Sequence, residues 1–270
     1  MKAVRYTALT VVAFFFLLPF YLVLRNGLAL ESEITAADWT WWPTEVHWEN
    51  FAELFNDPAV PLLRSMLNSL VVAVLQTVGQ LLLCSLAGYG LARIPYRYSN
   101  VVLYLVVATL MIPAAVTFVP SFVVVSTLGW VSDLRGLVIP GLFSGFTAFL
   151  FRQYFLTFPR ELEEAARIDG LGHWGTFWRI VVPNSRGFFA ALGVISFVTS
   201  WNQFLWPLVI AQDQDSWTVQ VALSTFLTAQ SLNLHELFLA AAVSIAPLVI
   251  VFVALQRFLV RGVTETGIKG

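Results

Sequence analysis

The chain has 270 residues, of which 58% are apolar and only 11% are charged, and its mean hydropathy is +0.77. Since a soluble domain is roughly half apolar and a quarter charged, this chain has too few charges to cover a globule, and a lipid-facing surface explains the composition. The net charge of −1 provides no overall field for nucleic acid. The single cysteine, Cys84, excludes a disulfide within the chain.

Six stretches are long and apolar enough to cross a bilayer as helices, which takes about 20 mostly apolar residues. They are about Tyr6–Leu24, Met66–Leu91, Val101–Leu128, Leu134–Phe155, Phe188–Ala211 and Leu237–Val260. The first follows basic residues as a signal peptide would, but its apolar core is too long and no small-residue cleavage site follows, so we expect a retained span. The sequence therefore predicts an all-α membrane protein with six transmembrane helices and a single domain over residues 1–270.

Basic residues fall unevenly on the segments between these spans. Of the 15 lysines and arginines, only Arg25, Arg64 and Arg135 lie in one set of segments, and the rest lie in the other. Because basic loops stay in the cytoplasm, we expect both termini there. The first outer loop, about residues 25–65, is acidic and rich in tryptophan. Interfacial anchoring is the favoured role for these rings, and contact with a binding protein is the alternative.

Proline occurs in five of the six expected spans. The positions are Pro19, Pro113, Pro120, Pro140, Pro207 and Pro247. Each proline removes a backbone donor and tends to bend its helix. These bends are either ordinary packing kinks or hinges of a bundle that opens alternately to each side.

A polar segment of about residues 157–187 separates the fourth and fifth spans and cannot lie in lipid. Pro159 suits the start of a helix, and the glutamates after it favour the positive end of the helix dipole. Gly170 and Gly172 can end that helix through a left-handed residue. A second amphipathic helix is expected after them, ended by Pro183. Its apolar stripe is Trp174, Phe177, Trp178 and Val181.

Such a helix, turn and helix would form a compact knob able to insert into a cleft on a partner. The small Ala165, Ala166 and Gly170 permit close backbone approach. The alternative is an ordinary surface helix with a pair between Glu164 and Arg167.

Polar groups inside the spans are candidates for a solute path, because uncharged amides in a membrane need partners. They are Gln76, Gln80, Asn202 and Gln203, and Trp201 could stack on a sugar face. Hydrogen bonding between helices is the alternative role for each amide. No span carries a strong central charge, so the marker of ion coupling is missing.

The sequence contains neither of two motifs that would indicate enzymatic chemistry. The only lysines are Lys2 and Lys269, so there is no P-loop, and His47, His173 and His235 form no H-E-x-x-H motif. We expect no catalytic residue, no metal site and no cofactor bound by this chain.

Several motifs resemble those of ABC importer permeases. The run Glu164, Ala165, Ala166, Asp169, Gly170, followed by Phe177, Val182 and Pro183, resembles the EAA motif of that family. Residues Trp201–Leu208 resemble its W-N-x-F-x-x-P-L pattern, and Asn68–Ser69, Ala87–Arg93 and the tail Gly262–Gly270 agree. The likeness covers nearly the whole chain and is greatest to carbohydrate permease subunits of the maltose/glycerol-3-phosphate, MalG-like type. Leu171, Gly187 and Thr264–Gly267 depart from the family pattern.

The resemblance implies a multi-pass permease of a prokaryotic cytoplasmic (inner) membrane that imports a sugar or related polyol. Its partners would be two ATP-binding subunits, a second permease subunit in a heterodimer, and an extracytoplasmic solute-binding protein. The ATP would be used by the partner subunit, docked on Glu164, Ala165, Ala166, Asp169 and Gly170. A standalone membrane channel or a structural membrane subunit is the alternative, since the spans alone would permit either.

Overall fold

The computed structural model of the protein describes residues 2–228 and 231–267. Helices form almost all of it, and the one strand pair in that part of the chain is a two-stranded antiparallel hairpin that pairs Leu227 with Leu232. The α-helices are α1 (Lys2–Gly27), α2 (Glu31–Ile34), α3 (Glu49–Asn56), α4 (Leu62–Arg93), α5 (Ser99–Leu110), α6 (Ala114–Thr127), α7 (Leu134–Val138), α8 (Gly145–Thr157), α9 (Arg160–Ile168), α10 (His173–Thr176), α11 (Val182–Asn184), α12 (Arg186–Trp201), α13 (Leu205–Ile210), α14 (Val219–Thr225) and α15 (Leu234–Gly267). The 3₁₀-helices are η1 (Ile139–Gly141) and η3 (Gln214–Ser216), and η2 (Phe177–Val181) is a π-helical turn. The strands are β1 (Leu227–Thr228) and β2 (Ser231–Leu232).

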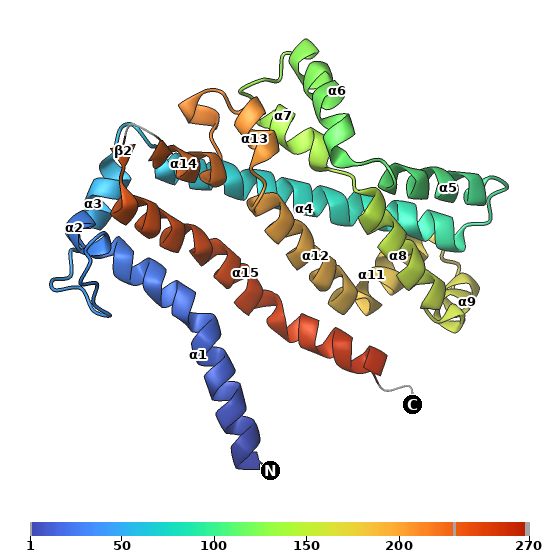
Figure 1. Cartoon of the computed structure of the whole chain (residues 1–270). Helices are drawn as coiled ribbons and strands as arrows, with labels where there is room; N and C mark the ends of the chain where they lie inside the picture. Colours follow the sequence, from blue (N-terminus) through green and yellow to red (C-terminus); the bar gives the residue numbers. More distant parts are fainter. Residues whose placement is uncertain (1, 229–230, 268–270) are drawn as a thin grey trace.

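Helix α4 is the central element, and α8 and α12 pack along it (Figure 1). Gly88 of α4 permits the close approach of α8, because a Cβ atom at this position would lie 2.6 Å from the Cβ of Phe151. Small residues play this role between membrane helices, where van der Waals packing drives association. Around this crossing, Cys84, Tyr89 and Phe155 belong to one buried cluster.

Helices α1 and α15 form an antiparallel pair beside this core. Gly27, at the end of α1, lies directly against Leu239 near the start of α15, and the two helices diverge toward the start of α1 (Figure 1). Most of α1 is therefore uncovered, and Phe14, Phe15 and Phe16 are exposed. A surface of this composition suits lipid.

The number of spans agrees with the sequence prediction in part. Four helices are long and apolar enough to cross a membrane, and two further pairs of helices, each bent at a short break, raise the number to six. The four are Lys2–Gly27, Leu62–Arg93, Leu134–Thr157 and Leu234–Arg257. A predominantly helical chain with four to six candidate spans thus agrees with the predicted fold class. The location of both termini in the cytoplasm stays a prediction from charge.

The expected span Val101–Leu128 is not a continuous helix, and its bend is where a proline was expected to act. It is divided into α5 and α6, which meet at an angle of 98°. Pro113 explains the break, since it disfavours helical backbone at the preceding Ile112 and cannot donate to a carbonyl of the preceding turn. In contrast, Pro19 and Pro247 lie inside continuous helices.

The expected span Phe188–Ala211 is also interrupted. Helix α12 ends at Trp201, and the separate helix α13 begins at Leu205. Pro207 has no N–H to donate to the carbonyl of Gln203, so a continuous helix would leave that carbonyl unpaired. The bent pair at this side of the bundle instead joins His173–Asn184 to Arg186–Trp201 at 80°.

Polar contacts mark the two ends of α4. At its start, Arg64 lies 3.4 Å from Asp215. At its end, Arg93 pairs with Glu163 of α9. The polar loop of α9 and the segment before α14 therefore lie at opposite ends of α4, as a membrane-crossing α4 requires.

Candidate functional site

Helix α9 presents two chemically different faces. Its inner face buries Glu163 and Ala166 against the rest of the chain, while Glu164 and Ala165 are exposed. Pro159 is the residue before its first turn, and Glu161 and Glu163 lie within that turn, as the sequence predicted. The helix is thus anchored on one side and free on the other.

Gly170 ends α9 in the left-handed region, with φ at +81°. Its N–H donates to the carbonyl of Arg167, and the N–H of Leu171 donates to that of Ala166, an arrangement that satisfies the last carbonyls of a helix. A Cβ atom at Gly170 would meet nothing within 4 Å. Within this chain, glycine is therefore needed for the backbone conformation and not for space. Gly172 has a negative φ and precedes α10 instead.

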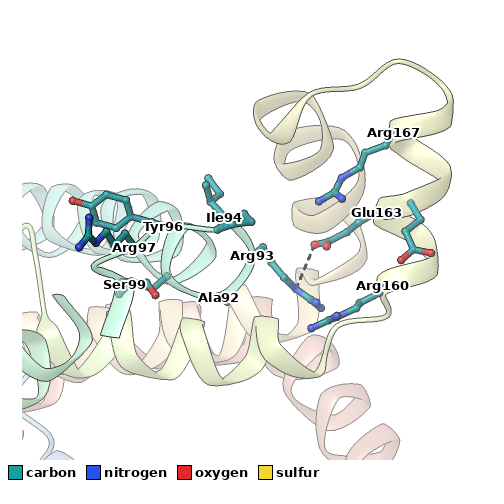
Figure 2. A pocket seen from close by; sticks show the side chains of 12 residues that line it. Ala92, Arg93, Ile94, Tyr96, Arg97, Ser99, Arg160, Glu163 and Arg167 are labelled. Atoms are coloured by element: carbon teal, nitrogen blue, oxygen red, sulfur yellow. Dashed lines mark ion pairs between the residues drawn. The ribbon is translucent and has the colours of Figure 1, made fainter. Parts of the chain in front are cut away.

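The inner face of α9 is held by a buried ion pair that the sequence analysis missed. Arg93 Nε lies 3.5 Å from Glu163 Oε1, and the two side chains are only 4% and 7% exposed (Figure 2). Arg93 also donates a hydrogen bond to the carbonyl of Phe158. The expected pair of Glu164 with Arg167 is not among the ion pairs of the described residues. Glu163 lies three positions before the buried Ala166, and that spacing is the signal that could have identified it.

The second half of the polar loop is less regular than predicted. Residues Phe177–Val181 form a π-helical turn between α10 and α11, and the chain turns at Ser185 and not at Pro183. The expected apolar stripe is divided, because a π turn shifts the side-chain spacing. Phe177 and Val181 are buried, with the Phe177 ring 5.1 Å from that of Tyr89.

The predicted docking residues thus occupy different environments. Glu164, Ala165, Asp169 and Gly170 are exposed, whereas Ala166 is buried against its own chain. Beside the exposed ones, Ile168 is 87% exposed and Trp174 of α10 is also uncovered. Exposed apolar side chains on a polar segment are the groups that a partner can cover, so Ile168 and Trp174 are candidates for a contact surface. Motif matching alone did not select Ile168.

The two glutamines of α4 bridge neighbouring helices. Gln76, which is 1% exposed, donates to the carbonyl of Leu137 at 2.8 Å and accepts from Ser200 at 2.7 Å. One turn further, Gln80 donates to the carbonyl of Gly141 at 2.8 Å and accepts from Ser196 at 3.0 Å. Both amides therefore join α12 to the segment of α7 and η1.

The remaining predicted path residues are placed around the break after α12. Trp201 is buried in a cluster with Phe197, and Asn202 donates to the carbonyl of Val198 at 2.9 Å. Gln203 lines a cavity of about 200 Å³ with Gln76, and Trp206 belongs to the same lining.

This cavity lies where two broken helices meet. Thr117 and Ser121 of α6 supply hydroxyl groups to it. Sequence reasoning missed them, although they follow the Pro113 break at a spacing of one helical turn. Broken helices in transporters commonly surround the solute site.

One group of side chains at the other end of the bundle could supply metal ligands. Ligand atoms of Glu53, His235 and Glu236 lie within 4.8 Å of one another. His235 already contacts Glu31 at 3.1 Å, however, and Glu53 is exposed. Geometry alone gives this group no defined role.

A helical bundle with broken spans around a polar cavity, and with a folded polar loop at one end, is the architecture of a membrane transport subunit. Comparison with known proteins identifies the family. Residues 81–265 match the family model described as "Binding-protein-dependent transport system inner membrane component". The chain belongs to this family, and it is a multi-pass component of a prokaryotic inner membrane. The sequence prediction of an ABC permease of the carbohydrate type is confirmed.

Curated relatives are similar along nearly their whole length. The AraQ permease protein of an arabinooligosaccharides transport system from Bacillus subtilis (strain 168) is 32% identical over 92% of this chain and 85% of its own. The sn-glycerol-3-phosphate permease protein UgpE of Yersinia pestis bv. Antiqua (strain Antiqua) is 32% identical over 93% of this chain and 91% of its own. The lactose permease protein LacG of Rhizobium radiobacter is 32% identical over 96% of this chain and 93% of its own.

A solved structure supports the fold. The crystal structure of a bacterial ABC transporter involved in the import of the acidic polysaccharide alginate superposes with a TM-score of 0.83 at 20% identity, covering 96% of each chain.

Proposed function

We propose that this chain is one permease subunit of an ATP-driven importer for a sugar or related polyol. Three relatives that match almost the whole chain are named for arabinooligosaccharides, sn-glycerol-3-phosphate and lactose. All of these solutes carry hydroxyl groups, which the polar lining around Gln203 could bind. Two ATP-binding subunits, a second permease subunit and an external solute-binding protein complete the assembly. The ATP-binding subunits, and not this chain, use the ATP.

The exposed face of α9 is the proposed dock for the ATP-binding subunit. The observation that carries this proposal is the 87% exposed Ile168, in a polar loop outside the apolar spans. Glu164, Ala165 and Asp169 surround it with small and charged groups. Ala166 contributes from the other side by packing α9 onto its own chain. An apolar anchor within a polar rim is the usual composition of a protein interface.

Co-purification from the native membrane tests this dock. Ile168→Asp and Gly170→Asp should each abolish recovery of a P-loop ATPase, while the chain remains monodisperse in detergent. Val46→Asp changes an exposed apolar residue of the outer loop and should leave recovery unchanged. Equal recovery with the Ile168→Asp variant would dismiss α9 as the dock. Recovery of the wild-type chain alone would favour a standalone membrane protein.

The cavity beside Gln203 is proposed as part of the solute path. Its hydroxyl and amide groups could exchange hydrogen bonds with solute hydroxyls, while Trp206 offers an aromatic face. Gln203→Ala should lower the transport rate. The control, Gln153→Ala, removes an exposed amide of α8 outside the cavity and should leave the rate unchanged. Unchanged solute affinity and rate in the Gln203→Ala variant would remove Gln203 from the path.

A further inference from the structure

A cavity of about 720 Å³ separates α9 from the connection between α4 and α5. Figure 2 shows Arg93, Arg160 and Arg167 on one side of it, and Arg97 on the other. Its lining also includes Glu163 and Glu164. Four arginines against two glutamates leave the lining with a formal charge of +2, so the cavity attracts anions.

Most of this positive charge is not neutralised within the chain. In the described residues, the only ion pair of the cavity joins Arg93 to Glu163. In the described part of the chain, the side chains of Arg160 and Arg167 form neither an ion pair nor a hydrogen bond, and the Arg97 guanidinium lies over the Tyr98 ring at 5.5 Å. A guanidinium group without a carboxylate partner is suited to bind phosphate oxygens.

The wall opposite α9 carries apolar and aromatic side chains beside Arg97. Leu91, Ile94 and Tyr96 line it, and the last two are exposed. Directly beyond it, α5 begins at Ser99 and presents exposed apolar side chains such as Tyr104 and Leu105. A basic cavity therefore continues into a lipid-facing helix surface. Tyrosines at such a boundary are typical of the membrane–water interface.

We propose that this cavity binds the phosphate headgroup of an anionic phospholipid, with Arg160 and Arg167 as the phosphate ligands and the acyl chains along α5. Basic pockets between membrane helices bind such headgroups. The apolar continuation favours a lipid over free phosphate, which would use the arginines alone. The proposal uses the side of α9 that faces the connection between α4 and α5, and it requires this side to stay open when the ATP-binding subunit docks on the face that carries Ile168.

Lipid binding to the full chain in detergent tests the proposal. Fluorescent phosphatidylglycerol should bind more tightly than phosphatidylcholine, and each arginine removed should weaken it about fivefold. Arg160→Gln with Arg167→Gln should therefore lose about 25-fold in affinity. The matched control, Arg179→Gln with Arg186→Gln, removes two exposed arginines of the same loop outside the cavity and should bind as the wild type does.

The lysine variant, Arg160→Lys with Arg167→Lys, keeps the charge and should retain most of the preference, which separates binding from folding. Equal weakening in the control pair would overturn the proposal, because it would show diffuse attraction. Displacement of the lipid by inorganic phosphate alone at millimolar concentration would assign the arginines to a free anion and refute the lipid. Loss of the preference when the ATP-binding subunit is bound would show that protein covers the cavity, and would also refute it.

Discussion

Removing Glu163 should release α9 from the rest of the bundle. The Glu163→Ala change leaves the Arg93 guanidinium buried, with the carbonyl of Phe158 as its remaining partner. Breaking a buried ion pair by removing one partner costs about 3 to 5 kcal/mol, because the other charge stays desolvated. We expect about 3 kcal/mol, at the lower end, since that carbonyl still accepts a hydrogen bond from Arg93.

Hydrogen exchange in the α9 peptide measures this effect. A loss of about 3 kcal/mol corresponds to an increase of over a hundredfold in the opening constant. The control is Glu164→Ala, the neighbouring carboxylate, which is exposed and has no ion pair in the described residues. A surface change of that kind stays within about 0.5 kcal/mol.

A double change completes the test. Arg93→Met with Glu163→Leu removes both charges and should recover much of the protection, because apolar residues often replace a buried pair without cost. If Glu163→Ala exchanged no faster than Glu164→Ala, the pair would not hold α9, and the reasoning from burial would be wrong.

Three further predictions concern separate features. Gly170→Ala should lower the free energy of unfolding by about 1 kcal/mol, since φ is +81° there. Gly90→Ala, in a helix with open space at Cβ, should raise it by about 0.5 kcal/mol. Thermal unfolding in detergent measures both changes. Gln76→Leu should cost about 2 kcal/mol in the same assay, because it leaves two buried partners unpaired. The hydrogen bond that the His47 ring donates to the Glu49 carboxylate raises the pKa of His47. The stability that the protonated His47 contributes is complete below about pH 6.5, and it is lost as pH rises through the raised pKa. Glu49→Gln should therefore lower the pKa of His47, as followed by NMR of the ring.

The spans were predictable because their signal is local. A run of about 20 apolar residues indicates a helix wherever it packs. The breaks in the spans were not predictable, because proline breaks the helix at some positions and lies within a continuous helix at others. Pro113 marks the 98° bend, while Pro247 lies within the unbroken α15. Whether freed backbone groups find other partners decides between these outcomes, and those partners come from other helices.

The polar loop was predictable in outline and not in detail. The glycine that ends α9 is a local requirement, so the sequence indicated Gly170 correctly as a left-handed end. Burial of Glu163 instead depends on Arg93, which lies in a distant part of the chain. The motif drew attention to Glu164, yet the carboxylate next to it makes the ion pair. Similarly, Phe177 of the π turn packs against Tyr89, a contact that no local spacing reveals.

The described contacts form a continuous path between the two candidate sites. The exposed face of α9 belongs to a rigid helix whose other face is tied to the end of α4 through Arg93. The same α4 is bonded through Gln80 and Gln76 to η1, α7 and α12. Gln76 in turn lines the cavity that Gln203 shares.

A displacement of α9 therefore has a stiff connection to the cavity, because α4 is a continuous 32-residue helix. The side chains on this path are charged or hydrogen-bonded groups in buried positions, which resist small independent shifts. Motion of such an assembly requires whole helices to move together, and the breaks before α6 and after α12 are where the chain can accommodate it. On this reasoning, we expect the interrupted spans to move relative to one another, and α4 to transmit a displacement of α9 as one rigid helix.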